Sequence, residues 1–181
     1  MFATDLRRWL PLACLLGSAA QAGPPPDWYR AHVDRLVADG GVWLADNSRY
    51  RSEQERFEAY GLAWQPGVGG LSAKGRLYGV VDGQDGGTIW EFRLYWHPGE
   101  DQAHLLQLGG GGAVLDGPLQ HEDGVERLQQ TFYAPDGSQW QTGHLTHWSG
   151  DSEHVGKSFR ISEDGEWIEQ RSYTWIRQPT R

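Results

Sequence analysis

The chain has almost no cysteine, few lysines and no apolar run long enough to cross a bilayer. Its single cysteine, Cys14, lies in residues 1–22, so the remainder can form neither a disulfide nor a thiolate active site. The longest apolar run lies in the same segment and has about a dozen residues, whereas a membrane-spanning helix needs roughly 20. Packing and backbone hydrogen bonds must therefore hold the fold together.

The opening sequence MFATDLRRWLPLACLLGSAAQAG has the pattern of a secretory signal peptide. Arg7 and Arg8 precede the apolar run, and the small residues of AQA precede Gly23, as at a cleavage site. We predict that residues 1–22 are removed, that residues 23–181 form one domain, and that the protein is periplasmic or secreted.

The predicted mature chain is acidic. Without Asp5, Arg7 and Arg8, the 16 basic and 24 acidic side chains become 14 and 23, a net charge of −9 with neutral histidine. This charge repels the phosphate backbone of nucleic acids and the surface of anionic bilayers, so we expect neither as a partner. Lys74 and Lys157 are the only lysines, so the basic charge is almost all arginine, which suits stacking and carboxylate pairing.

The abundant residues favour aromatic strands joined by tight turns, because the chain has ten tryptophans, seven tyrosines and 25 glycines. One short helix is predicted in DWYRAHVDRLVADGG, where Trp28, Ala31, Val33 and Leu36 have helical spacing. Beyond it, apolar and polar residues alternate between turn sequences such as PDGS. The segments between the turns predict about ten strands, at 41–48, 55–64, 71–81, 88–97, 102–109, 112–120, 125–134, 138–148, 153–162 and 165–177.

Consecutive strands joined by short turns form an antiparallel meander. A sheet of this kind would leave two exposed edges unless it closed on itself. We therefore predict an all-β fold, an up-and-down antiparallel β-barrel of about ten strands with a short N-terminal helix. The GGGG at 109–112 contributes no side chains and predicts a bend, a bulge or a gap in the wall.

Three residues resemble the signature of the calycin superfamily, which includes lipocalins and fatty-acid-binding proteins. Gly41 and Trp43 follow the short helix as a Gly-x-Trp motif, and Arg177 lies in the last strand. The resemblance implies that Trp43 plugs the closed end of the barrel, that Arg177 packs across it, and that Gly41 lets the chain enter the floor tightly. It extends to small exported bacterial lipocalin-like proteins of uncharacterised function. Lipocalins have eight strands, so a count near ten is closer to fatty-acid-binding proteins and nitrobindin-like haem barrels.

Alternation along the strands predicts which side chains face the barrel interior. A dry core would reject Glu169 and Arg171, because buried charges are costly unless they are paired. A barrel of this size can instead hold water or a ligand among polar side chains. The predicted inward set, taken from strands 88–97, 138–148 and 165–177, includes Trp90, Phe92, Trp140, His144, Trp167, Glu169, Arg171, Tyr173, Trp175 and Arg177.

Arg171 and Tyr173 form an Arg-x-Tyr pair on the last strand, similar to the pair with which fatty-acid-binding proteins hold a carboxylate. The two side chains point the same way, about 7 Å apart along the strand, and suit one anionic head group. In the alternative interpretation, Arg171 pairs with Glu169 or with an acid of a neighbouring strand, and the aromatic residues are core.

The histidines favour no metal site. His144 and His147 of HLTH are an odd number of residues apart, so on a strand they face opposite sides. His147 would instead meet His154 across a hairpin, but two histidines are too few for a zinc site. His144 is the candidate for a haem ligand, and the alternative is a core histidine hydrogen-bonded to Thr142 or Thr146.

We predict a barrel that binds a small apolar or amphipathic molecule in its interior. In one form of this prediction the ligand has an anionic head group. No Gly-x-Ser-x-Gly motif or calcium-loop spacing is present, and haem is the one cofactor considered. Two alternatives stay open: an enzyme that uses Glu169 or His144 for proton transfer, and a structural or interaction module with a filled interior. The sequence predicts no oligomeric state. The predicted ligand contacts are Arg171, Tyr173, Glu169, His144, Trp90, Phe92 and Trp140.

Overall fold

The computed structural model describes residues 23–179, so the predicted signal peptide lies outside the described residues. Within them, one α-helix, α1 (Asp27–Val37), is followed by a short 3-10 turn, η1 (Ala38–Gly40). A second 3-10 turn, η2 (Val68–Gly70), lies between two of the strands. No helix in this part of the chain is long and apolar enough to cross a membrane.

The helix α1 is amphipathic and buries one of its faces. Tyr29, His32, Val33 and Leu36 are buried and recur at spacings of three and four residues, as on one side of a helix. Ala31 was predicted to share this face but is exposed, because it projects from the other side. A histidine therefore occupies a position that the sequence pattern assigned to apolar residues.

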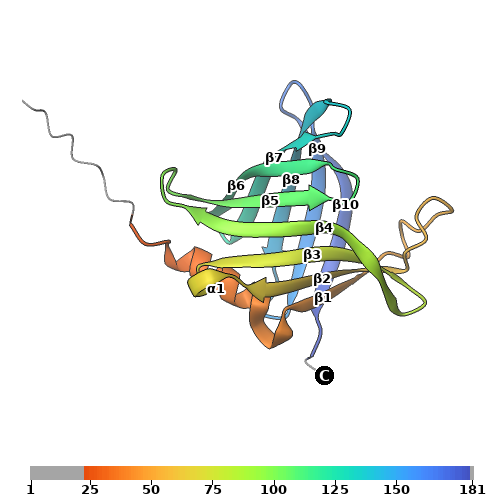
Figure 1. The fold of residues 1–181 in the computed structure, drawn as a ribbon, viewed down its shortest axis with the longest axis horizontal. Helices are drawn as coiled ribbons and strands as arrows, with labels where there is room; N and C mark the ends of the chain where they lie inside the picture. The colour runs from red at the N-terminus through yellow and green to blue at the C-terminus, as the bar shows by residue number, and fades with distance from the viewer. Residues whose placement is uncertain (1–22, 180–181) are drawn as a thin grey trace, which may run out of the picture.

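Ten β-strands of the described chain form a closed barrel, in which every strand is antiparallel to its neighbours (Figure 1). The first strand also pairs with the last, with Trp43 opposite Arg177 and Leu44 opposite Ile176, and this pairing closes the sheet. The predicted fold class is confirmed. The strands are β1 (Val42–Asp46), β2 (Ala59–Pro66), β3 (Ser72–Val81), β4 (Gln84–His97), β5 (Gln102–Gly109), β6 (Val114–Glu122), β7 (Val125–Tyr133), β8 (Gln139–Trp148), β9 (Glu153–Ile161) and β10 (Trp167–Arg177).

Tight turns produce the up-and-down order. Asp82 and Gly83 connect β3 to β4, and Asp123 and Gly124 connect β6 to β7. All four have positive φ, as two-residue hairpin turns require. The GGGG at 109–112 forms the turn between β5 and β6, so it is a bend, one of the three outcomes predicted.

The connection between β1 and β2 is longer than predicted. β2 begins only at Ala59, and residues 47–58 form a loop. Asn47 is fully buried and its backbone carbonyl accepts the N–H groups of Tyr50 and Arg51, which turns the chain out of the sheet. The loop therefore leaves the barrel rim and returns to it, and it projects to one side of the molecule in Figure 1.

Trp43 fills the end of the barrel at which β1 begins. Its side chain is fully buried, its Nε1–H donates to the carbonyl of Leu36 at 3.1 Å, and the Arg177 guanidinium lies 4.7 Å from its ring centroid. Gly41 has a φ of 68°, and a Cβ there would overlap the carbonyl oxygen of Trp64, so only glycine fits. Gly41, Trp43 and Arg177 therefore pack together at this end of the barrel.

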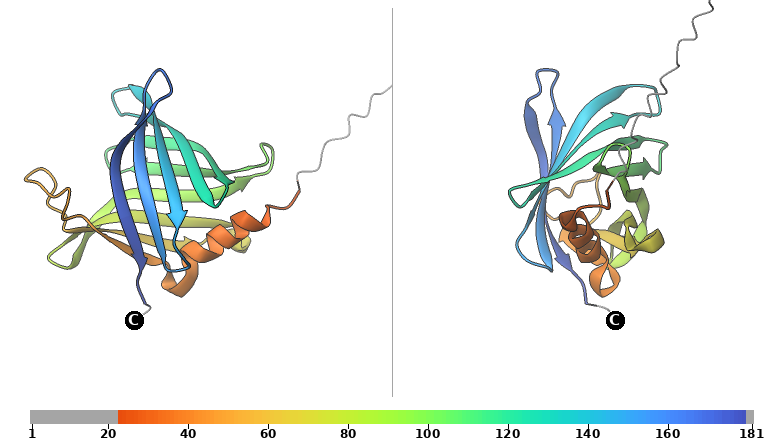
Figure 2. Two further views of the ribbon diagram at one scale, coloured as in Figure 1. Left: turned by 180° about the vertical axis from the view of Figure 1, so that it is seen from behind. Right: turned by 90° about the vertical axis from the view of Figure 1, so that its left-hand side faces the viewer.

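The helix α1 lies across the same end of the barrel (Figure 2). Near its start, Trp28 meets Trp96 of β4, with 6.4 Å between the ring centroids. Farther along, His32 is hydrogen-bonded to Glu126 of β7 at 2.6 Å. Because β4 and β7 lie on different sides of the barrel, these contacts hold the helix across its floor.

Candidate ligand-binding cavity

A cavity of about 450 Å³ lies inside the barrel and is lined by α1 and by every strand except β1. This volume is within the range of about 300–1,000 Å³ that is usual for small-molecule sites. Its floor lies above Trp43 and α1, where Leu36 and Trp148 line it. The cavity is therefore the candidate ligand-binding site of the barrel.

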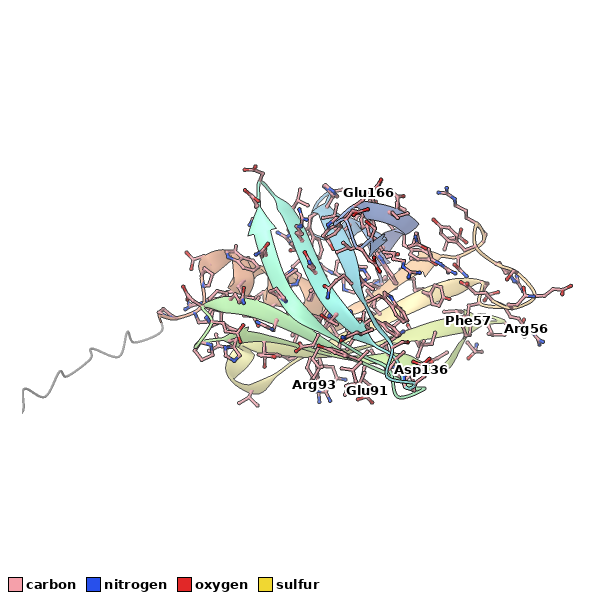
Figure 3. All side chains as sticks on the ribbon, turned by 90° about the horizontal axis from the view of Figure 1, so that it is seen from above. Arg56, Phe57, Glu91, Arg93, Asp136 and Glu166 are labelled. Atoms are coloured by element: carbon pink, nitrogen blue, oxygen red, sulfur yellow. The ribbon has the colours of Figure 1, made fainter. Side chains whose placement is uncertain are left out.

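The side of the cavity formed by β2 to β6 is mainly apolar. Strand pairing places Leu62 opposite Leu77 and Leu94 opposite Leu105, and all four side chains line the cavity. Because side chains alternate along a strand, Arg93 points to the outer surface, where Figure 3 labels it. We call this side the leucine side.

The side formed by β7 to β10 is more polar, and we call it the polar side. Cross-strand partners share one face of a sheet, so each row of paired residues projects into the cavity together. A ligand inside would therefore lie between an apolar and a polar surface. The first row is Glu126, Thr146, Gly156 and Tyr173. The adjacent row is Leu128, His144, Ser158 and Arg171.

Glu126 is the buried acid of the polar side. Its side chain is 4% exposed, and Oε1 accepts hydrogen bonds from His32 Nδ1 at 2.6 Å and from Trp148 Nε1 at 2.7 Å. Burial alone raises the pKa of Glu126, but the nearby His32 and the two hydrogen bonds outweigh burial and hold this pKa below its usual value. The cavity floor therefore carries a carboxylate that is ionised at neutral pH.

His144 and His154 also line the cavity, and burial lowers the pKa of each to about 4, so both rings are neutral at pH 7. Among the described residues His144 has no hydrogen bond to Thr142, whose hydroxyl donates to the carbonyl of Gln130, or to Thr146, and haem binding by His144 stays a prediction. His154 lies opposite Trp148 and not opposite His147, so the predicted histidine pair does not form.

At the other end of the cavity, Arg171 pairs with Glu55 of the loop 47–58. Its Nη1 donates to Oε1 at 2.6 Å and its Nη2 donates to Oε2 at 2.5 Å. Tyr173 Oη accepts from Arg171 at 3.0 Å and donates to Asn47 at 2.8 Å, and Tyr60 donates to Glu55 at 2.7 Å. The hydrogen bonds from Arg171 lower the pKa of Glu55 to about 2. Arg171 and Tyr173 do lie together, but a loop acid already neutralises the arginine.

Replacing Glu55 by glutamine should loosen the loop 47–58. The side chain of Arg171 is 38% exposed, so solvent screens this pair, and we expect a loss of about 1 kcal/mol in the free energy of unfolding. Amide hydrogen exchange in the loop should become faster at the same time. Glu53→Gln, an exposed change in the same loop, is the control. Unchanged exchange in Glu55→Gln would contradict the role given to this pair.

A β-bulge in β10 corrects the predicted face of Glu169. The pairing of β10 with β9 shifts between Glu169 and Arg171, so the residues before the bulge face the opposite way from those after it. Glu169 lies on the outer surface and pairs with Lys157 at 2.9 Å, and Trp167 packs there under Arg127. The prediction that Glu169 and Trp167 face the interior is wrong.

Of the three aromatic residues predicted to contact a ligand, two line the cavity and one does not. Trp90 and Phe92 line the cavity, whereas Trp140 does not. Trp140 stacks on Phe132 with 4.1 Å between the ring centroids, and Phe132 in turn meets Trp90 at 6.2 Å. Trp140 therefore packs behind a cavity residue and does not touch the cavity itself.

Three polar residues of the site were not among those predicted from the sequence. Glu126 shares its face of β7 with Leu128, so the alternation along this strand indicates that it faces inward. His32 is four residues before Leu36 on the buried face of α1, which is a similar signal. Glu55 gives no signal, because it belongs to an irregular loop and meets Arg171 only in the folded chain.

Within residues 23–179, no three His, Cys, Asp or Glu side chains lie close enough together to hold one metal ion. No protein-family model matches the chain, and a search of curated proteins finds no similar sequence.

Proposed function

We propose that this protein binds a small apolar or amphipathic molecule inside its barrel. The observation that carries the proposal is the cavity of about 450 Å³ between the leucine side and the polar side. An interior filled with side chains would leave no such space, so the cavity favours ligand binding over a purely structural role. Contact with the leucine side would supply most of the affinity, because burial of apolar surface is the main favourable contribution.

We also propose that the barrel is of the calycin type and that the protein is exported. The closed barrel, the N-terminal helix and the packing of Trp43 against Arg177 support a calycin-type fold. The signal-peptide pattern of residues 1–22 supports export. In such a protein the cavity would serve to carry or store a ligand outside the cytoplasm.

The geometry does not favour an anionic head group at Arg171. Both terminal nitrogens of Arg171 already donate to Glu55, so a carboxylate ligand would have to displace an existing ion pair. The enzyme alternative loses one of its two candidate residues, because Glu169 lies on the outer surface. A neutral or amphipathic ligand that lies across the cavity fits these contacts best.

The test is a titration with N-phenyl-1-naphthylamine, an apolar probe that becomes fluorescent when it is buried. Leu105→Trp should fill part of the cavity and weaken binding by about tenfold, because the probe loses apolar contact and space. Leu106→Trp is the matched control, since Leu106 is the next residue of β5 and faces the outer surface opposite Arg93. It should bind the probe like the wild type.

Two results would contradict the proposal. One is the absence of probe binding by the folded wild type. The other is equal affinity in Leu105→Trp and Leu106→Trp, which would place the probe outside the cavity. Circular dichroism of both variants checks that each is folded.

A further inference from the structure

One oxygen of the buried carboxylate of Glu126 is unused. Oε1 accepts the N–H groups of His32 and Trp148, whereas Oε2 has no hydrogen-bond partner among the residues that the structure describes. A carboxylate offers about four acceptor positions, so Oε2 is free to accept a hydrogen bond from a donor inside the cavity. Since Glu126 lines the cavity, a donor group of a ligand can complete its hydrogen bonding.

We infer that the ligand is an amphipathic amine whose ammonium group donates a hydrogen bond to Oε2 of Glu126. The inference rests on the proposed binding function and names the chemical class of its ligand. It places the polar end of the ligand at the cavity floor and its apolar part along the leucine side.

The surroundings of Glu126 suit a cation. Trp148, which donates to Oε1 of Glu126 at 2.7 Å, and Trp175 both line the cavity, and aromatic faces attract cations. His32 is held on Oε1 at 2.6 Å, and His154, which also lines the cavity, is neutral at pH 7 and adds no opposing charge. Arg35 lies over the Trp148 ring at 4.6 Å and pairs with Asp151 at 3.5 Å, so its charge is already partly balanced.

Other head groups fit less well. A carboxylate would be repelled by Glu126, and the arginine and the lysine of the cavity lining are already paired, Arg171 with Glu55 and Lys157 with Glu169. An alcohol can also donate a hydrogen bond to the ionised Oε2, but it has no charge of its own and lacks the Coulomb attraction that an ammonium group adds. The cavity should therefore rank an amine above an alcohol and an alcohol above an acid of the same chain length.

The leucine side offers an apolar surface to the hydrocarbon part of the ligand. Leu62, Leu94 and Leu105 of the leucine side lie across the barrel from the rows that hold Glu126 and His144. An alkyl chain that starts at the floor can follow these leucines. A primary alkylamine such as decylamine is the simplest probe with both parts.

The experiment compares decylamine, decanol and decanoate as competitors of N-phenyl-1-naphthylamine on the full chain. In the wild type, decylamine should bind about tenfold to a hundredfold more tightly than decanol, and decanoate should bind most weakly. Glu126→Gln keeps an acceptor for His32 and Trp148 but removes the charge, so the ratio of the two affinities should fall to about one. Glu91→Gln, an exposed change on the outer surface, should keep the wild-type ratio.

Equal affinities for decylamine and decanol in the wild type would overturn the inference, and so would an amine preference that survives in Glu126→Gln. Either result would leave the binding function intact, because probe binding tests that function separately. If Glu126→Gln does not fold, decyltrimethylammonium replaces it as the test, since it carries the charge but has no N–H to donate. It should bind the wild type more weakly than decylamine, and equal or tighter binding would contradict the hydrogen bond to Oε2.

Discussion

Replacing Trp43 by alanine should lower the free energy of unfolding by about 3–5 kcal/mol, as other buried aromatic-to-alanine changes do. The ring is fully buried and lies edge-on to Trp148 at 5.6 Å and to His154 at 4.9 Å. The change also removes the hydrogen bond to Leu36 and the ring under Arg177. Because Trp43 joins α1, β1, β8, β9 and β10, its loss should loosen the whole closed end of the barrel.

Trp167→Ala is the matched control for this prediction. Trp167 is only partly buried and packs on the outer surface under Arg127, so its loss should cost less than half as much. Urea unfolding followed by circular dichroism measures both variants. Equal losses in the two variants would show that Trp43 does not act as the plug of the barrel floor.

Acid should destabilise the barrel between about pH 6.5 and pH 4, by about 1.4 kcal/mol per pH unit for each of two interior histidines. Burial lowers the pKa of His144 and His154 from 6.5 to about 4 in the folded protein. Between these values the unfolded chain binds protons that the folded chain does not bind, so stability falls as the pH falls. Below about 4.5, Glu55 adds a further loss, because its pKa of about 2 lies below the ordinary 4.5.

His144→Gln isolates this effect, because it removes one of the two histidines from the cavity. The slope of stability against pH between 6.5 and 4 should then fall by about half. His147→Gln is the control, since His147 is exposed on the outer face of the same strand. Unfolding midpoints measured at several pH values give both slopes, and an unchanged slope in His144→Gln would contradict the account.

The closed barrel could be predicted because its determinants are local. Alternation and Asp-Gly turns define each strand, and the number of strands makes closure the way to remove the sheet edges. Gly41 and Trp43 are adjacent to the helix, and Arg177 ends the last strand, so their packing follows from the order of the strands around the barrel. Each of these features is determined by a few residues that lie close together in the sequence.

The site was harder to predict, because its geometry depends on single residues of β10 and of the loop 47–58. The bulge between Glu169 and Arg171 adds one residue to β10, and nothing in a regular alternation reveals it. The partner of Arg171 is Glu55, which is 116 positions away in the sequence and lies outside any strand. Both features appear only when the strands are placed beside one another.

A crystal structure of the protein grown with N-phenyl-1-naphthylamine tests the central claim most directly. The account predicts density for the probe between the leucine side and the polar side, in contact with Leu105 and His144. An interior in which side chains fill this space, with no density for the probe, would contradict it.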